Sequence, residues 1–248
     1  MKRELEICGR RMVVYATKDA GSPSKDGPHT SYCIGRVDVH RDLAAFRGLC
    51  KTIRKRGGVD RVMELFGGSG WHAASIQELL SPDVHFALDI SKDCIRSMEE
   101  SDLQGVNIVR ADSYKFAATT LRKHKFDWVH ADFNQFTLNR ANESKYKETL
   151  IGAFKSAERF VTITDSAIFG IVRFEKNRRS YAQSYGMDPD DWLDYYRVVS
   201  EHYRKHFDFG IVRVIHWSGM ASMYLLEKGW KAELRIKKQV KPAKVIEL

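Results

Sequence analysis

The sequence predicts an α/β protein with one central, mostly parallel β-sheet, helices on both faces and an antiparallel strand pair at its C-terminal end. Short apolar runs alternate with segments of helical periodicity through the central part of the chain. Three glycines, Gly67, Gly68 and Gly70, separate the first central strand from its helix. Two late apolar runs are joined by a Ser218-Gly219 turn, which is too short for a parallel connection.

These patterns predict the following elements in chain order. The central strands are expected at 62–65, 84–88, 106–109, 126–131 and 159–164, with helices at 71–80, 92–100, 113–123 and 145–157. A hairpin within 1–16, a mobile loop at 18–30, a lead-in helix at 41–56, a late helix at 190–206 and a hairpin of 210–217 with 220–226 complete the prediction.

We expect a single domain with additions at both ends. Residues 1–58 form an N-terminal part of hairpin, loop and lead-in helix, and 59–230 form the main domain. Within that domain, 166–190 is an insertion at the substrate side, and 231–248 is a basic tail. The order of elements predicts no internal repeat.

The composition indicates a globular chain with a basic surface. Hydrophobic residues make up 43% and charged residues 29%, which excludes disordered and fibrous classes. Lys and Arg number 41 against 32 Asp and Glu, and the net charge of +9 favours a polyanionic partner, although a merely solvated basic surface is the alternative.

Cellular location is predicted from the cysteines and from the first residues. The four cysteines are far apart and form no C-x-x-C pair, which argues against a zinc cluster or a disulfide framework. The first residues are charged and lead into no apolar segment, and no apolar run is long enough to cross a membrane. We therefore expect a cytoplasmic protein without membrane contact.

The glycine turn fits two classes of ligand. Gly68, Gly70 and Ala73 satisfy the spacing of a dinucleotide-binding turn, and Asp89 follows about 20 residues later. However, Glu64 stands immediately before the turn, and a carboxylate there would repel a pyrophosphate. A positively charged ligand would be attracted by the same carboxylate.

The segment Glu64-Leu65-Phe66-Gly67-Gly68-Ser69-Gly70 resembles the first motif of the class I, Rossmann-like S-adenosylmethionine-dependent methyltransferases, in which an acid precedes a Gly-x-Gly turn. Their sheet also ends in an antiparallel hairpin. The resemblance covers about residues 60 to 226 and implies S-adenosyl-L-methionine as cofactor. The implied cofactor residues of the first motif are Glu64, Phe66, Gly67, Gly68 and Gly70.

Further cofactor residues are expected at the ends of the next two strands. Asp89 would accept the two ribose hydroxyls, and Ile90 would pack against the adenine. Asp112 and Ser113 follow the third strand, where a carboxylate beside an aromatic would hold the adenine amino group. Asp112 also fits a helix N-cap, and that alternative stays open.

The fourth strand ends at the position that faces the transferred methyl group in this fold. Methyltransferases acting on amino nitrogens carry Asp or Asn there, followed by two prolines and an aromatic. Asp132, Asn134 and Phe136 supply the acceptor and aromatic types, while the prolines are absent. The resemblance implies these three residues as catalytic, with loop capping by Asp132 as the alternative.

Two further segments point toward RNA. The sequence Thr162-Ile163-Thr164-Asp165 resembles a segment of guanine-N2 tRNA methyltransferases, over about ten residues. The insertion carries arginines, which could contact phosphates, next to an aromatic residue, which could stack on a base. The expected substrate-binding residues are Arg173, Arg178, Arg179 and Tyr181. A solvated charged face is the alternative for this insertion.

The histidines give no metal prediction. His72, His130 and His216 lie near the ends of predicted elements, and none has metal-ligand spacing with another. We expect packing or hydrogen bonds for each of them.

The sequence therefore predicts methyl transfer from S-adenosylmethionine, most simply to a base of RNA or, less favoured, DNA. The alternatives are a methyltransferase of small molecules or proteins, a nucleic-acid-binding protein that keeps the fold without transfer, and a nicotinamide-dependent oxidoreductase. The sequence predicts neither the acceptor atom nor the oligomeric state.

Overall fold

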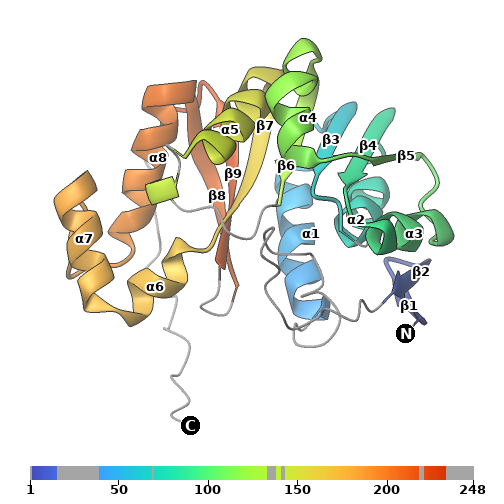
Figure 1. Cartoon of the computed structure of the whole chain (residues 1–248), viewed down its shortest axis with the longest axis horizontal. Helices are drawn as coiled ribbons and strands as arrows, with labels where there is room; N and C mark the ends of the chain where they lie inside the picture. The colour runs from blue at the N-terminus through green and yellow to red at the C-terminus, as the bar shows by residue number, and fades with distance from the viewer. Residues whose placement is uncertain are drawn as a thin grey trace, which may run out of the picture.

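The computed structural model of the chain describes residues 2–15, 39–68, 70–132, 138–140, 143–217 and 221–232. Two β-sheets are present in these ranges, a two-stranded hairpin and a seven-stranded sheet (Figure 1). The predicted loop at 18–30 and most of the predicted tail at 231–248 lie outside the described residues.

The elements follow the predicted alternation closely. The strands are β1 Lys2–Ile7, β2 Arg10–Tyr15, β3 Arg61–Leu65, β4 Val84–Asp89, β5 Val106–Arg110, β6 Phe126–Ala131, β7 Ala157–Asp165, β8 Phe209–Trp217 and β9 Ala221–Lys228. The helices are α1 Val39–Lys55, α2 Trp71–Leu80, α3 Lys92–Glu100, α4 Ser113–Thr119, α5 Ser144–Ser156, α6 Ala167–Arg173, α7 Glu175–Tyr185 and α8 Asp194–Phe207, with short 3-10 turns η2 Leu121–Lys123 and η3 Leu138–Arg140.

The large sheet has the strand order β5-β4-β3-β6-β7-β9-β8. Strands β3 to β7 are mutually parallel, whereas β9 is antiparallel to both β7 and β8. The predicted parallel sheet with a terminal antiparallel pair is therefore confirmed. The strand order reverses between β3 and β6, and ligands of open α/β sheets bind at the carboxyl ends of the strands on either side of such a reversal.

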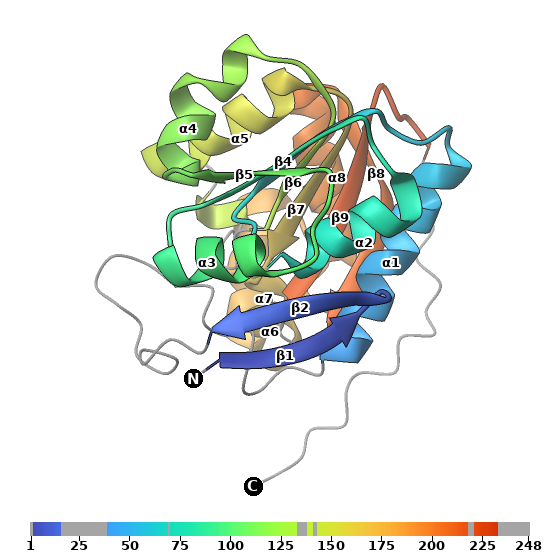
Figure 2. The same cartoon turned by 90° about the vertical axis from the view of Figure 1, so that its right-hand side faces the viewer.

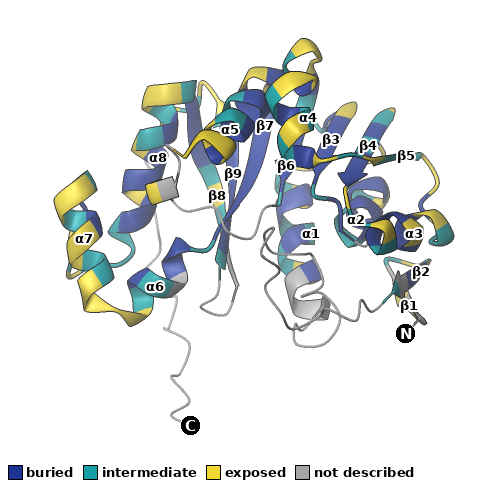
Figure 3. Cartoon of the chain, viewed as in Figure 1, coloured by how far each residue is buried: buried dark blue, intermediate teal, exposed yellow. Residues whose placement is uncertain are grey.

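Helices cover both faces of this sheet, and its central strands are buried, whereas the edge strand β5 is partly exposed (Figure 3). On one face, apolar residues of β3, β6 and β7 pack with residues of α4, α5 and α8 in the largest core cluster. On the other face, Val62, Trp128 and Phe160 pack against Phe46 and Ile53 of α1. Full burial of these side chains contributes about 1.5–3 kcal/mol each, so the sheet is fixed from both sides.

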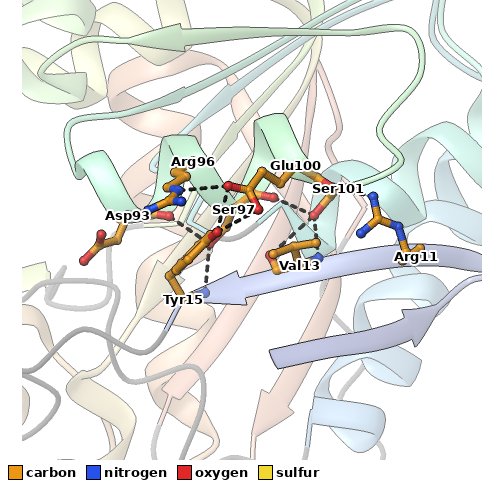
Figure 4. Close-up of polar contacts among 8 residues, drawn as sticks. All are labelled: Arg11, Val13, Tyr15, Asp93, Arg96, Ser97, Glu100 and Ser101. Atoms are coloured by element: carbon orange, nitrogen blue, oxygen red, sulfur yellow. Dashed lines mark hydrogen bonds and ion pairs between the residues drawn. The ribbon is translucent and has the colours of Figure 1, made fainter. Parts of the chain in front are cut away.

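The N-terminal hairpin docks on α3 near the carboxyl ends of the strands (Figures 1 and 2). The backbone N–H groups of Val13 and Tyr15 donate to Ser101 Oγ at 2.8 Å and Ser97 Oγ at 3.2 Å (Figure 4). The Tyr15 hydroxyl donates to the Glu100 carboxylate at 2.7 Å. These bonds satisfy backbone donors of the edge strand β2, so α3 covers an edge that would otherwise be open for pairing.

The insertion, for which the sequence predicted no secondary structure, folds into two helices, α6 and α7. The late helix α8 also begins at Asp194 and not near residue 190. Carboxylates account for that later start, since Asp188 accepts from the N–H of Asp190 at 2.9 Å and Asp191 from that of Leu193 at 3.1 Å. Such side-chain-to-backbone bonds favour turns over helix.

Candidate functional site

The turn after β3 is built on three residues with left-handed backbone. Phe66, Gly68 and Gly70 have φ values of 63°, 54° and 82°. Glycine adopts this region freely, whereas phenylalanine there costs about 1–2 kcal/mol. The Phe66 N–H donates to Ser113 Oγ at 3.1 Å, and its ring lies 4.8 Å from that of Tyr114. Contacts from the start of α4 thus hold the strained residue.

Gly67 lies where strand and turn come closest together. Its N–H donates to Leu88 O at 2.6 Å, and an added Cβ would lie 3.4 Å from that same oxygen, from Ala87 Cβ and from Glu64 Oε1. A Cβ at this position would therefore fill the space against β4 and the Glu64 carboxylate, in van der Waals contact with both.

Asp89 ends β4 directly beside the turn. Its Oδ2 accepts from Gly68 N at 3.0 Å and its Oδ1 from Ser91 N at 2.8 Å. Burial raises the pKa of this carboxyl, while the hydrogen bonds from Ser91 and Gly68 oppose that shift. A carboxylate accepts about four hydrogen bonds, so Asp89 retains some acceptor capacity for a ligand hydroxyl.

Ile90 is one of two large apolar side chains described as exposed, at 55%. It follows Asp89 at the carboxyl end of β4. An apolar group is thus exposed on this edge, and its packing against the adenine stays a prediction.

Glu64 is almost completely buried, with 1% of its surface exposed. Its Oε2 lies 3.6 Å from Nε2 of the buried His85, and among the described residues neither carboxylate oxygen has a hydrogen-bond donor. An unpaired buried carboxylate is costly. A positively charged group approaching the turn would therefore gain from this carboxylate.

Asp112 and Ser113 support the turn in the structure. Asp112 is the N-cap of α4 and accepts from Tyr114 N at 2.9 Å and Lys115 N at 3.2 Å. Ser113 is buried and accepts from Phe66 N. The helix-cap alternative for Asp112 is thus confirmed, and contact of either residue with a cofactor stays a prediction.

Asp132 follows β6, across the strand reversal from the turn. Its Oδ1 accepts from Thr164 Oγ1 at 2.6 Å, and its Oδ2 lies 3.7 Å from His72 Nδ1. The Asp132 side chain is 18% exposed, so it is accessible at this edge. Asn134 and Phe136 lie outside the described residues, and their catalytic roles stay predictions.

A pair of histidines joins the two sides of the strand reversal. His72, in the first turn of α2, has its Nδ1 2.9 Å from Nε2 of His130 on β6. His130 Nδ1 lies 2.5 Å from Thr162 Oγ1, which also accepts from Trp128 Nε1 at 3.1 Å. Burial lowers the pKa of His130 well below its ordinary value, so this imidazole is neutral at neutral pH. The predicted hydrogen bonding of both histidines is confirmed.

No local pattern in the sequence links His72 with Asp132. The two residues follow different strands, and only the strand order makes those strands neighbours. Their meeting could have been predicted only from their positions after the central strands β3 and β6. Residues that follow two parallel strands meet at one edge of the sheet once these strands are paired.

Asp165 at the end of β7 is buried among tyrosines. Its Oδ2 accepts from the hydroxyls of Tyr195 at 2.6 Å and Tyr224 at 3.0 Å, and its Oδ1 from Ala167 N at 2.7 Å. Burial raises the pKa of Asp165 to about 6, against the effect of these hydrogen bonds. This carboxylate joins β7, α8 and β9 and has no exposed surface.

The four predicted substrate residues divide into two groups. Arg178 donates to the carbonyls of Pro189, Ile171 and Val172, and the Tyr181 ring is buried against Tyr195. These two side chains are engaged within the fold, and a buried ring is not available to stack on a base. Arg173 and Arg179 are exposed, so a substrate contact stays a prediction for them.

A separate basic hollow lies between α1 and β8. It is lined by Gly48, Lys51, Arg54, Lys55 and Arg213. The Arg213 guanidinium is held by Thr52 Oγ1 at 2.7 Å. Part of the positive charge of the chain is thus gathered on one surface.

No helix within the described residues has the length and apolar character needed to cross a membrane.

Several solved structures with a similar fold are methyltransferases. The methyltransferase domain of the bacterial protein CtHen1-C matches 76% of this chain and 99% of its own length, with a TM-score of 0.52 and 8% identity. The plantazolicin methyltransferase BpumL, solved with S-adenosylhomocysteine and a desmethyl plantazolicin analogue, covers 80% of this chain and 89% of its own, with a TM-score of 0.50 and 11% identity. Magnesium protoporphyrin IX methyltransferase from Synechocystis, also solved with S-adenosylhomocysteine, covers 79% and 90%, with a TM-score of 0.50 and 12% identity.

No protein-family model and no curated protein sequence matches the chain. The structural matches establish the fold of the class I S-adenosylmethionine-dependent methyltransferases for this protein, as its first motif predicts. The acceptors named for the matched enzymes differ, so the fold by itself does not select an acceptor.

Proposed function

We propose that this protein is a methyltransferase that uses S-adenosyl-L-methionine. One observation carries the proposal: the glycine turn contacts Asp89 at the carboxyl ends of the strands, where Gly68 N donates to Asp89 Oδ2. The strand order of the sheet reverses next to this contact, between β3 and β6. Enzymes of the same fold are solved with S-adenosylhomocysteine. S-adenosylmethionine supplies an activated methyl group on a sulfonium, and the protein has to bind it and orient the acceptor.

The residues of the site fit such a cofactor. Asp89 has some acceptor capacity left for a ribose hydroxyl, and the exposed Ile90 supplies an apolar surface for adenine. The buried carboxylate of Glu64 favours a cationic ligand and disfavours a pyrophosphate. The charge of Glu64 therefore supports S-adenosylmethionine over a nicotinamide dinucleotide.

Asp132 is the residue proposed to orient the acceptor. It stands after β6, opposite the turn, and Thr164 fixes one of its carboxylate oxygens. The other oxygen is placed to accept a hydrogen bond from an acceptor amine or hydroxyl. Holding donor and acceptor in line accounts for most of the rate gain expected of such an enzyme. Asn134 and Phe136 are proposed as further catalytic residues, and this proposal rests on the sequence motif alone.

We further propose a nucleic-acid base, RNA in preference to DNA, as acceptor. The net charge of +9, the basic hollow on α1 and β8, and the exposed Arg173 and Arg179 support a polyanionic substrate. The likeness of the segment around Asp165 to guanine-N2 tRNA methyltransferases favours RNA. A methyltransferase of small molecules or proteins is the alternative, and it would act with little dependence on salt.

Calorimetric titration with S-adenosylhomocysteine tests the cofactor proposal. Hydrogen bonds to a charged group contribute about 1.5–3 kcal/mol each, so losing one in Asp89→Ala should weaken binding about 10-fold or more. Asp127→Ala is the matched control, because this carboxylate lies near the opposite ends of the strands, where it accepts from Asp60 N and Arg61 N. Circular dichroism verifies that both variants are folded.

Micromolar binding that is lost only in Asp89→Ala supports the proposal. Absence of binding to the wild-type protein, or binding of NAD in its place, refutes it. Transfer of labelled methyl groups to RNA and DNA pools at increasing salt then tests the acceptor, and activity on neither pool refutes a nucleic-acid substrate.

A further inference from the structure

Three side chains with metal-binding atoms converge at the strand reversal. Among the described residues, His72, His130 and Asp132 form the one group of three His, Cys, Asp or Glu residues in which one possible ligand atom from each lies within 4.8 Å of the others. His72 Nδ1 is 2.9 Å from His130 Nε2 and 3.7 Å from Asp132 Oδ2. They come from three places, namely the first turn of α2, strand β6 and the residue after β6.

Two of the three distances between the ligand atoms are close to those in a metal coordination sphere, and the third, between His130 Nε2 and Asp132 Oδ2, is within 4.8 Å. Tetrahedral zinc binds nitrogen and oxygen at about 2.0–2.2 Å, which places neighbouring ligand atoms about 3.3–3.5 Å apart. The two distances from His72, 2.9 Å and 3.7 Å, lie on either side of that value. Shifts of a few tenths of an ångström, within the reach of side-chain rotation, would equalise them.

Each of the three side chains is oriented by a second residue. Thr162 holds Nδ1 of His130, which leaves Nε2 directed at His72. Thr164 holds Oδ1 of Asp132, which leaves Oδ2 on the side of His72. The Phe46 ring stacks on the His72 ring with centroids 4.0 Å apart. Such supporting contacts are typical of protein metal sites, where they fix the direction and tautomer of each ligand.

We propose that His72 Nδ1, His130 Nε2 and Asp132 Oδ2 bind one divalent transition-metal ion, for which Zn²⁺ is the best match. Two imidazoles and one carboxylate suit zinc and its first-row neighbours, whereas Mg²⁺ and Ca²⁺ take oxygen ligands. The hydrogen atom shared by the two histidines leaves this position, because His72 changes tautomer and carries its hydrogen on Nε2 and not on Nδ1, and the ion takes the vacated place between the rings. Both imidazoles stay neutral, with hydrogen on His130 Nδ1, donated to Thr162 Oγ1, and on His72 Nε2.

The site is open on one side. The side chains of His72 and Asp132 are 20% and 18% exposed, whereas His130 is fully buried. An ion with three protein ligands keeps a fourth position for water or a substrate atom. With the ion bound, Asp132 Oδ2 holds the ion and no longer contacts the acceptor directly, and on the proposed function the fourth position of the ion faces the methyl acceptor in its place. Binding of the ion itself is independent of the function.

Titration of the metal-free full-length protein with Zn²⁺ by calorimetry, and with Co²⁺ by visible absorption, tests the site. We expect one ion per chain and no comparable binding of Mg²⁺. Loss of supporting contacts alone lowers metal affinity 10–100-fold, so His72→Ala and Asp132→Asn, which remove ligands, should lower it about 100-fold or more. Asp132→Asn is nearly isosteric and keeps an acceptor for Thr164.

His206→Ala is the matched control. His202 and His206 lie one turn apart on α8 with ring centroids 4.6 Å apart, and such a pair is a competing surface site for zinc. Binding that survives in His206→Ala and fails in His72→Ala supports the proposal. Absence of Zn²⁺ and Co²⁺ binding, or binding that is lost in His206→Ala and kept in His72→Ala, overturns it. S-adenosylhomocysteine binding is measured without metal, so failure of the metal site and failure of the proposed function are separate results.

Discussion

Replacing Asp165 by asparagine should change how the stability of the protein depends on pH. The pKa of Asp165 is raised from 3.8 to about 6 because the carboxyl is buried. The folded state thus holds this proton more tightly than the unfolded state. Its stabilising contribution is fully present below pH 3.8 and is lost as the pH rises through about 6.

The size of this effect follows from the shift. A difference of about 2 pKa units corresponds to about 3 kcal/mol between the two protonation states. Between pH 4 and pH 7.5, wild type should lose about 2 kcal/mol of this contribution to its free energy of unfolding. Asp165→Asn has no proton to lose, so its free energy of unfolding relative to wild type should rise by about that amount over the same range.

Urea denaturation of both proteins at several pH values measures this difference, and the other titrating groups cancel in the comparison. Tyr224→Phe supplies a second check. Its hydroxyl donates to Asp165 and lowers the pKa of that carboxyl, so the variant should lose stability more at neutral than at acidic pH. The reasoning would be refuted if the difference in free energy of unfolding between wild type and Asp165→Asn stayed constant from pH 4 to pH 7.5.

Further predictions concern packing and the arginines of the insertion. Gly152→Ala should destabilise the protein by about 3 kcal/mol or more in thermal or urea unfolding, because the new Cβ would lie 2.0 Å from the backbone oxygen of Ala117; an unchanged melting temperature would contradict this packing. Arg178→Ala should cost about 1–3 kcal/mol, since three backbone carbonyls lose their donor. Arg179→Ala should change the free energy of unfolding by no more than about 0.5 kcal/mol, because the ion pair of Arg179 with Glu175 is exposed. If urea denaturation gave an equally small change for Arg178→Ala, Arg178 would have no structural role.

The regular elements of the main domain follow from local sequence. For α2 and α3 the predicted and observed bounds coincide, at Trp71–Leu80 and Lys92–Glu100. Both helices have clear local boundaries, since Gly70 stands before α2 and Ser91 caps α3 by accepting from Cys94 N. The insertion was not predicted to be helical because α7 is rich in charged residues and buries only Tyr181 among the residues of that helix. A polar helix lacks the apolar stripe on which such predictions rest.

Several residues of the candidate site, Asp132 among them, were predicted from the sequence. The glycine turn, Asp89 and Glu64 were predicted because a turn and a following strand end lie within about one β-α-β unit. The hydrogen bonds of Arg178 to backbone carbonyls and the burial of Tyr181 were not predicted. The local sequence around a charged or aromatic side chain does not indicate whether that side chain faces solvent or the core.

The sequence by itself determined the alternation of strands and helices, the glycine turn with its neighbouring acid, and the antiparallel end of the sheet. Hydrophobic periodicity and turn chemistry act over a few residues, so they can be read locally. Only the tertiary structure decided that β3 and β6 are neighbours, and with that the meeting of His72, His130 and Asp132. His72 and His130 are 58 residues apart in the chain, and what brings them together is burial of both faces of the sheet, which no local pattern encodes.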